Sequence, residues 1–261
     1  MEPYYRTDLA WVHHVGYSQH AKRTAPGIVR LIRDAGLAPG AQVLDVGCGS
    51  GRLARMLLNA GFAVHGVDAS PAMIALARNH APAGRFDVLR LPTRRRPGSA
   101  GALPQADAVV STGHTLNYLA SRADIARALI ELAGAVRPGG VLAIDLMVDV
   151  RRGKQPDSHV RLTDDWAIYT RFSRPSAHRL DRAITVFRLV GTTWRRSDET
   201  HHNLAFDAGE ALRLLRGAGI DAVSRPAFGN EKLPGDLVVL TGTRGAARLR
   251  ARQLNLPRTR S

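Results

Sequence analysis

Three glycines at alternate positions and two nearby aspartates are the residues of this 261-residue chain whose types and spacing best suit ligand binding. Gly47, Gly49 and Gly51 follow the apolar run 43–46, and a helical pattern begins directly after them. Glycine lets the backbone approach a ligand closely and adopt a positive φ. We therefore expect a strand, a glycine turn and a helix N-terminus that together form a nucleotide cradle.

The spacing of these residues favours one kind of nucleotide. The glycines read G-x-G-x-G, whereas the dinucleotide fingerprint is G-x-G-x-x-G. Asp45 precedes the turn and would repel a pyrophosphate, but it would attract the ammonium group of an amino acid. Asp68 ends the next apolar run, where a carboxylate can accept both hydroxyls of a ribose. A ligand with an amino-acid end and a ribose end is S-adenosylmethionine.

Three further side chains could act on a methyl acceptor. An amine only needs to be neutral, whereas a hydroxyl also needs a base. His114 follows an expected strand at the cofactor's edge and is the leading base or substrate anchor, unless its ring only bonds backbone. Glu199 and His201 share one face of an expected strand. They could bind a substrate amine or hydroxyl, or lie on a surface hairpin.

Strands and helices alternate along residues 41–146, which predicts a parallel sheet with helices on both faces. Ser70 and Pro71 suit the start of a helix, and Asp207 and Glu210 have capping-box spacing. Between about 166 and 206, apolar residues recur at even spacing, which predicts antiparallel strands. The expected strands of the main sheet cover residues 43–46, 62–67, 86–91, 106–110, 141–148 and 237–241.

The first 40 residues precede this alternation. His13, His14, Tyr17 and His20 fall on an expected helix that could be a lid over the cradle or an ordinary surface helix, and a second helix is expected over 26–35. Adjacent histidines point to different sides of a helix, which argues against a metal pair. The chain after residue 244 is basic, and we expect it to be mobile.

Composition limits the other possibilities. The formal net charge is +15, but arginine is spread along the whole chain and only three of the 37 basic residues are lysine. This pattern suits solvated charge better than a nucleic-acid face. Cys48 is the only cysteine, so an internal disulfide is excluded. With no apolar run long enough to span a membrane and no secretory signal, we expect a cytoplasmic monomer or homodimer.

Four segments together resemble the class I S-adenosylmethionine-dependent methyltransferases. They are VLDVGCGSG, GVDAS, ADAVVSTGHTLNYL and RPGGVLAIDL, and the likeness covers about residues 41–146. The small-molecule branch, with amino-sugar N-methyltransferases and glycine N-methyltransferase-like enzymes, is the most similar. The resemblance implies a Rossmann-like α/β fold whose seven-stranded sheet has the order 3-2-1-4-5-7-6, with strand 7 antiparallel. It divides the chain into a helical cap at 1–40, a methyltransferase domain at 41–243 and a basic tail at 244–261, with an antiparallel insertion over 151–206 on the substrate side.

The resemblance also implies the cofactor contacts. Gly47, Cys48, Gly49 and Gly51 would line the methionine end, Asp68 the ribose, and Ala69 and Met73 the adenine edge. The family often has an acid or a small polar residue at the end of the third strand. Here Leu89, Arg90 and Leu91 stand at that place, and Asp87 comes too early to fill it. Asp45, Thr112, Gly113 and Tyr17 complete the expected cofactor site.

The function that follows is methyl transfer from S-adenosylmethionine to N or O of a small-molecule acceptor. Cys48 is expected to pack in the turn rather than to act as a nucleophile. A metal site is not expected, because only Asp145 is near the strand ends that would supply clustered acids. Two alternatives stay open: an RNA- or protein-modifying methyltransferase that uses the arginine-rich surface, and a cofactor-binding protein without enzymatic activity.

Overall fold

Two sheets form the frame of the molecule. The computed structural model describes residues 4–17, 19–96, 98–149 and 157–245. Its main sheet has seven strands in the order β10-β11-β5-β4-β1-β2-β3, and its small sheet has the order β6-β7-β8-β9. The main-sheet strands are β1 (Gln42–Val46), β2 (Ala63–Asp68), β3 (Arg85–Val88), β4 (Ala106–Ser111), β5 (Val136–Met147), β10 (Ile220–Arg225) and β11 (Leu237–Arg244).

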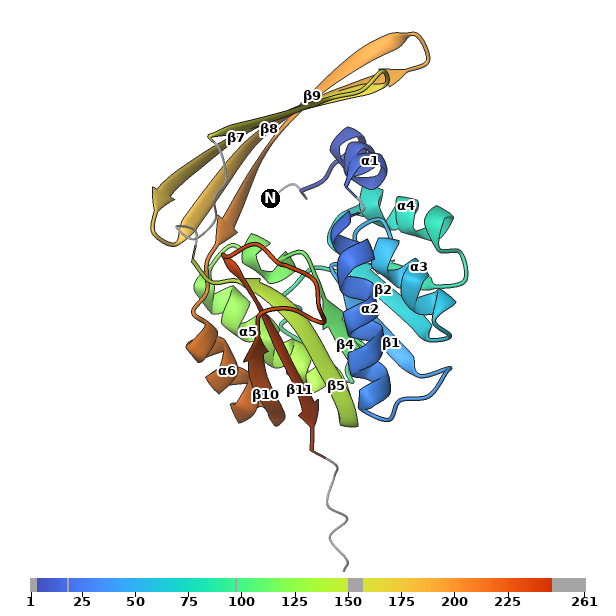
Figure 1. The fold of residues 1–261 in the computed structure, drawn as a ribbon, viewed down its shortest axis with the longest axis vertical. Helices are drawn as coiled ribbons and strands as arrows, with labels where there is room; N and C mark the ends of the chain where they lie inside the picture. Colours follow the sequence, from blue (N-terminus) through green and yellow to red (C-terminus); the bar gives the residue numbers. More distant parts are fainter. Residues whose placement is uncertain (1–3, 18, 97, 150–156, 246–261) are drawn as a thin grey trace, which may run out of the picture.

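The strand order confirms the expected fold class. β1 to β5 pair in parallel, while β11 pairs antiparallel with both β5 and β10. β11 is therefore the antiparallel seventh strand of the order 3-2-1-4-5-7-6. The carboxyl ends of β1, β2 and β4 lie at one edge, below the small sheet (Figure 1). Among the described residues, no helix has the length and apolar character needed to cross a membrane.

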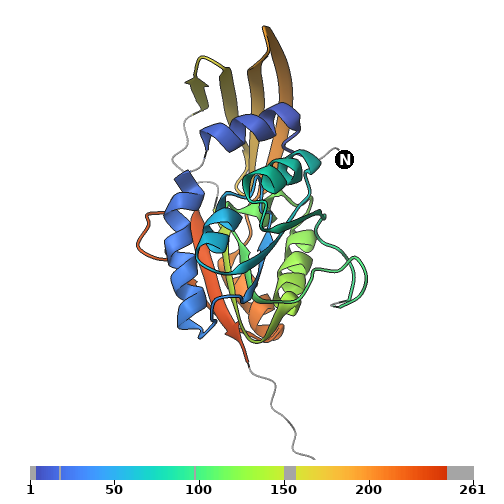
Figure 2. The same cartoon turned by 90° about the vertical axis from the view of Figure 1, so that its right-hand side faces the viewer.

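Helices cover both faces of the main sheet (Figures 1 and 2). On one face lie α2 (Gln19–Asp34), α3 (Arg52–Asn59) and α4 (Pro71–His80); on the other lie α5 (Arg122–Ala135) and α6 (Ala208–Gly217). Ile28, Leu57 and Ile74 share one core cluster, and Leu129 and Leu215 belong to the second. Each sheet face is thus buried by amphipathic helices, as the alternating pattern predicts.

The expected helix starts are present. The Ser70 hydroxyl accepts the N–H of Met73 at the start of α4, whose first residue is Pro71. The Asp207 carboxylate accepts the N–H of Glu210 at the start of α6. Each cap satisfies an N–H group that has no partner within its own helix. The Ser70 cap matters most here, because it fixes the chain directly after Asp68.

Two elements begin earlier than predicted. The second helix starts at Gln19 rather than 26, with Pro26 inside it, and β5 starts at Val136 rather than 141. The Thr24 hydroxyl donates to the carbonyl of His20 one turn before the proline. Near the start of β5 the pairing with β4 is irregular: the register shifts between Ala106 and Ala108, and φ of Gly139 is +79°.

The expected division at residue 40 does not follow the packing. Ile28 and Ile32 of α2 are fully buried in the main core, so α2 belongs to the sandwich. α1 (Thr7–Gly16) lies between the sandwich and the small sheet, which consists of β6 (Ser158–Leu162), β7 (Trp166–Ser176), β8 (Arg179–Val190) and β9 (Thr193–Leu204). On the sandwich side, His14 of α1 meets His80 of α4. On the side of the small sheet, Leu9 and Val12 pack with Trp166 and its neighbours. The predicted basic tail falls almost wholly outside the described residues, as do residues 151–156 of the insertion.

Candidate active site

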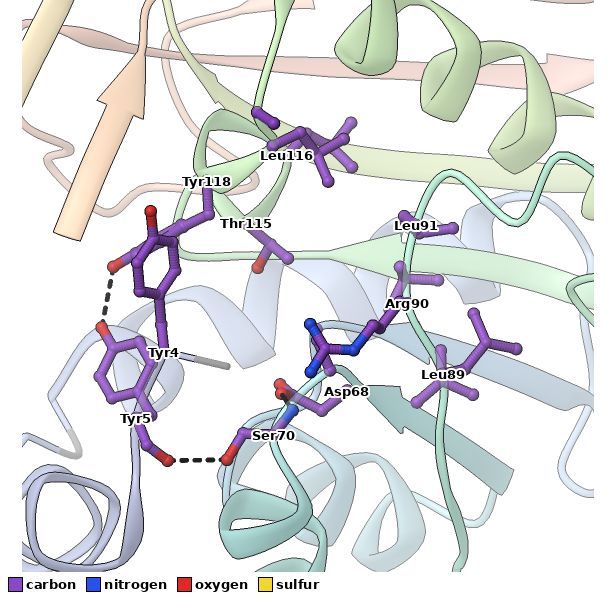
Figure 3. A pocket seen from close by; sticks show the side chains of 16 residues that line it. Tyr4, Tyr5, Asp68, Ser70, Leu89, Arg90, Leu91, Thr115, Leu116 and Tyr118 are labelled. Carbon is purple, nitrogen blue, oxygen red and sulfur yellow. Dashed lines mark hydrogen bonds between the residues drawn. The ribbon is translucent and has the colours of Figure 1, made fainter. Parts of the chain in front are cut away.

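Two adjoining cavities open where β1, β2 and β4 end. The smaller has a volume of about 250 Å³ and the larger about 460 Å³. Tyr5, Gly47, Thr115 and Tyr118 belong to the walls of both, so the two cavities meet at these residues. Figure 3 shows the smaller one, with tyrosines at one side and the 89–91 segment at the other.

The glycine turn fits this meeting point because its three glycines have no side chains. Gly47, Gly49 and Gly51 all have positive φ values, between +51° and +75°. A Cβ on Gly47 would lie 2.2 Å from Cγ2 of Thr115, closer than any real contact. A larger residue would therefore push η1 (Thr115–Tyr118) away from the turn, and the cradle needs glycine here for both space and conformation.

Asp68 stands beside this turn with both carboxylate oxygens engaged. Its Oδ2 accepts the N–H of Gly49 at 2.9 Å, and its Oδ1 accepts the N–H of Ser70 at 2.8 Å. Burial raises the pKa of Asp68, while the backbone N–H groups oppose that change. Each oxygen can accept a second hydrogen bond. The carboxylate is thus held in place and can still take two ribose hydroxyls.

The smaller cavity has mostly apolar walls beside Asp68, and Ala69, Leu89, Arg90 and Leu91 all line it as expected. Asp87 lies outside this wall and pairs with His65 at 2.8 Å and with Arg85 at 3.0 Å. An apolar slot beside a ribose-binding carboxylate is suited to a flat base such as adenine. Figure 3 shows the Arg90 side chain reaching over the cavity toward Asp68.

Asp45 supplies the acid of the larger cavity. Its side chain is buried, and Oδ2 has no hydrogen-bond partner. Burial, with a smaller contribution from the Asp68 charge, raises the pKa of Asp45 to about 7. A buried acceptor without a partner is costly. An ammonium group in the larger cavity would supply the missing partner and favour the ionised carboxylate.

Most of the other predicted cofactor residues line the larger cavity: Gly49, Cys48, Met73, Thr112, Gly113 and Tyr17. Met73 was expected beside Ala69 at the adenine edge, but the structure separates the two, because α4 turns Met73 toward Gly49. Cys48 is buried, and burial raises the pKa of its thiol well above the usual value. These observations fit the packing role predicted for Cys48.

His114 is fixed in the wall of the larger cavity. It adopts a left-handed backbone conformation, with φ of +48°, and its N–H and that of Gly113 both donate to the Asp145 carboxylate. The ring stacks on Tyr118 with centroids 5.8 Å apart. Its Nδ1 is buried without a partner. Burial, helped by the nearby charge of Arg182, lowers the pKa of His114 to about 4, so the ring is neutral at neutral pH.

Glu199 and His201 share one face of β9 as predicted, but neither lines a cavity. The Glu199 carboxylate accepts the N–H groups of Tyr5 and Arg6, each at 2.8 Å, and lies 2.8 Å from Nε2 of His201. The expectation that both reach the acceptor therefore needs correction. The carboxylate is occupied by the N-terminal segment, which lies between β9 and the cavities.

The N-terminal segment is the part of the site that sequence reasoning missed. The Tyr5 hydroxyl lies 2.8 Å from that of Tyr118, and the Tyr5 carbonyl accepts the Ser70 hydroxyl at 2.7 Å (Figure 3). The Tyr4 ring packs on His201 with centroids 4.5 Å apart. Tyr4 and Tyr5 thus connect the small sheet to the chain beside Asp68. No local spacing signals this, because the partners are more than 60 residues away in sequence.

A metal centre has no visible basis in the described part of the chain. Within it, no group of three or more His, Cys, Asp and Glu side chains is arranged to hold an ion. His13 and His14 are adjacent on α1 and face different neighbours: the His13 ring stacks on Tyr17, while His14 meets His80. The chemistry of this site must therefore be argued from the cavity walls.

Comparison with known proteins points to the same class. Residues 43–140 match the model of a methyltransferase domain. YqeM of Bacillus subtilis (strain 168), provisionally named a methyltransferase, is 27% identical over 190 residues, which are 71% of this chain and 76% of YqeM. The sugar N-methyltransferase KedS8 from Streptoalloteichus sp ATCC 53650 has a TM-score of 0.72 at 22% identity, covering 94% of this chain and 96% of KedS8.

A second solved structure was determined with the cofactor. CalS10 from Micromonospora echinaspora, an amino pentose methyltransferase with bound SAM, has a TM-score of 0.65 at 23% identity and covers 93% of this chain and 99% of its own. At such identities the likeness concerns the fold. Residues 43–140 are thus similar to a methyltransferase domain, and the strand order of the main sheet is the one expected of the class I fold.

Proposed function

We propose that the protein transfers the methyl group of S-adenosylmethionine to a nitrogen or oxygen of a small molecule bound in the larger cavity. The observation that carries this proposal is the position of His114, whose unpartnered Nδ1 is buried in the wall shared with Asp45 and the glycine turn. Tyr5 of the N-terminal segment and Arg161 and Arg182 of the small sheet contribute to the wall of this cavity, and a cavity of about 460 Å³ walled on several sides favours a small acceptor over a polymer.

In this proposal the cofactor, when bound, supplies an activated methyl group on a sulfonium. Asp68 would hold the ribose hydroxyls and Asp45 the ammonium group, from the walls of the smaller and the larger cavity respectively. Positioning of this kind can contribute roughly 7–11 kcal/mol in favourable cases. His114 accepts a hydrogen bond from the N–H or O–H of the acceptor and directs its lone pair toward the methyl group. The proton leaves to His114 or to solvent as the new bond forms.

The low pKa of His114 limits what it can do. A ring whose pKa is about 4 is a weak base, although it is always available as an acceptor at neutral pH. It therefore suits an amine, which needs orientation in its neutral form, better than an alcohol. Two of the structural relatives act on sugars, one of them an amino pentose. Amino sugars are accordingly the first acceptors to test.

Glu199 and His201 act as positioning residues in this proposal. Their contacts hold Tyr5 and Arg6, and Tyr5 in turn contacts Tyr118, the ring on which His114 stacks. They would influence turnover through the shape of the cavity rather than by touching the acceptor.

The test is a methyl-transfer screen with labelled S-adenosylmethionine and small amines, led by amino sugars, with small alcohols as a second set. We expect turnover with an amine and a fall of about 10²-fold or more in kcat for His114→Ala, the lower range for positioned acid–base groups. His159→Ala is the matched control, because His159 is exposed on β6. Calorimetry should show that S-adenosylhomocysteine binds to the wild-type protein and to both variants. Methylation of RNA or protein but of no small molecule would overturn the proposal.

A further inference from the structure

We propose that the methyl acceptor carries an anionic group, a carboxylate or a phosphate ester, that binds the guanidinium of Arg182. This inference rests on the proposed function, since it specifies the substrate class of the same cavity. Arg182 lies on β8 of the small sheet and lines the larger cavity opposite the glycine turn, together with His114 and Tyr118.

The partners of Arg182 leave its charge uncompensated. Its Nη2 donates to the Tyr118 hydroxyl, and its Cζ lies 5.2 Å from the centroid of the Tyr118 ring. Its Nε is buried with no hydrogen-bond partner. No carboxylate of the described residues lies within ion-pair distance of it. A buried guanidinium without a counter-charge is costly, so a ligand that supplies one would be strongly favoured.

Neighbouring arginines on the same strand differ from Arg182. Arg179 pairs with Asp181 at 2.7 Å, and Arg188 pairs with Asp8 at 3.2 Å. Asp181 comes from β8 itself and Asp8 from α1, so the arginines of β8 that face other parts of the protein have acidic partners. The arginine that faces the cavity has only neutral hydroxyl and ring contacts.

The rest of the cavity wall has the same sign of charge. Arg52 and Arg161 donate to the main-chain carbonyls of His14 and Gly16 rather than to carboxylates. Asp45 is the acid of this wall, and it stands at the glycine turn, where it is expected to bind the cofactor's ammonium group. Glu199 of β9 is already occupied by Tyr5, Arg6 and His201, and Asp181 of β8 by Arg179 and His202. With the cofactor bound, the acceptor end of the cavity would be cationic.

The geometry also relates the anion to the reacting atom. The Tyr118 hydroxyl accepts a hydrogen bond from Arg182, and the His114 ring stacks on the Tyr118 ring with the two planes 12° from parallel. An acceptor whose anion binds Arg182 would therefore place its nucleophile near His114 if the two groups are a few bonds apart. A guanidinium binds carboxylate and phosphate oxygens through two parallel hydrogen bonds, which fixes orientation as well as distance.

Matched probes test this inference in the protein saturated with S-adenosylhomocysteine. Calorimetry compares benzoate with benzamide, and phenyl phosphate with phenol, so that each pair differs mainly in charge. We expect at least one acid to bind about tenfold or more tightly than its neutral partner, the scale of a charge-assisted hydrogen bond. Arg182→Gln should remove this preference, and Arg182→Lys should keep part of it. Arg171→Gln, on the exposed part of β7, is the control and should behave as wild type.

The outcomes separate the possibilities. Preference for benzoate assigns a carboxylate, and preference for phenyl phosphate assigns a phosphate ester. Equal binding of acids and neutral partners, or a preference that persists in Arg182→Gln, overturns the inference. S-adenosylhomocysteine binding to Arg182→Gln shows that the variant is folded. If the proposed function itself is wrong, the result is different: no small molecule, charged or neutral, is methylated.

Discussion

Asp45 and Asp68 show how two buried carboxylates in one site are prepared for different ligand groups. Asp68 is fixed by the N–H groups of Gly49 and Ser70, whereas one oxygen of Asp45 has no partner. The first arrangement keeps a carboxylate ready for hydroxyl donors. The second leaves a site that is complete only with a cation, and it raises the pKa of Asp45 to about 7.

Cofactor binding should therefore release protons through Asp45. An ammonium group beside the carboxylate lowers its pKa, so near pH 6.5, where about half or more of the unliganded protein is protonated at Asp45, binding expels that proton. Affinity for S-adenosylhomocysteine should rise between about pH 6 and pH 8. Calorimetry in two buffers of different ionisation enthalpy measures the number of protons released.

Asp45→Asn should lose this release and bind more weakly. Asp87→Asn, which alters a carboxylate outside both cavities, should keep it. If Asp45→Asn releases as many protons as the wild-type protein, the proton comes from another group and the role given to Asp45 is wrong.

At the scale of elements, the main sandwich and the small sheet are joined by α1 and the short segment before it. Leu9 and Val12 of α1 are buried against Trp166 and its neighbours, while Glu199 holds the backbone of Tyr5 and Arg6. These contacts decide whether the larger cavity is covered. The sequence predicted a helix here but left its role as lid or surface helix open.

Leu9→Ala should loosen α1 from the small sheet without unfolding the main sheet. Removing a buried leucine side chain costs about 2–5 kcal/mol, and here that loss falls on the docking of one helix. Hydrogen exchange should become faster in residues 7–16 while β1, β4 and β5 stay protected. Val15→Ala, on the exposed side of the same helix at 43% exposure, is the control. Equal loss of protection in the main sheet would show that α1 is part of the global core.

At the scale of the whole molecule, part of the positive charge is partnered by acids of the protein itself. Arg94 pairs with Asp124, Arg195 with Asp8, and Arg196 with Asp198, and these three arginines belong to the short runs 94–96 and 195–196. This supports solvated, internally paired charge over a nucleic-acid face. Residues 151 and 152, and the basic run after 245, lie outside the described residues.

Buried histidines should make the fold sensitive to acid. Burial lowers the pKa values of His13, His14 and His114 to about 4, against about 6.5 in an unfolded chain. Between these values the unfolded chain binds more protons, so the free energy of unfolding falls as pH falls from 6.5 toward 4. Asp45 acts in the opposite sense. Its pKa is raised by folding, so the folded protein binds this proton more tightly than the unfolded chain, and the resulting contribution to the free energy of unfolding is lost as pH rises toward 7. The histidines are more numerous, so the net effect should be loss at acid pH.

Urea denaturation at about pH 5 and pH 7 measures this balance. The midpoint should be lower at pH 5, and His13→Gln should reduce the difference, because it removes one buried titrating ring. A urea midpoint that is equal at the two pH values, or higher at pH 5, would contradict this prediction.

The sequence alone determined the glycine turn with its two aspartates, the alternation of strands and helices, and the helix starts at Ser70 and Asp207. The G-x-G-x-G turn, Asp45, Asp68 and the Ser70 cap lie within or next to single strand–turn–helix units, where local spacing specifies geometry. Tertiary structure alone decided what covers the acceptor. Tyr5 and Glu199 are 194 residues apart, and Tyr118 and Arg182 are 64 apart. Such pairs meet only because the small sheet and α1 pack over the strand ends, and the register of that packing leaves no periodic trace in the chain.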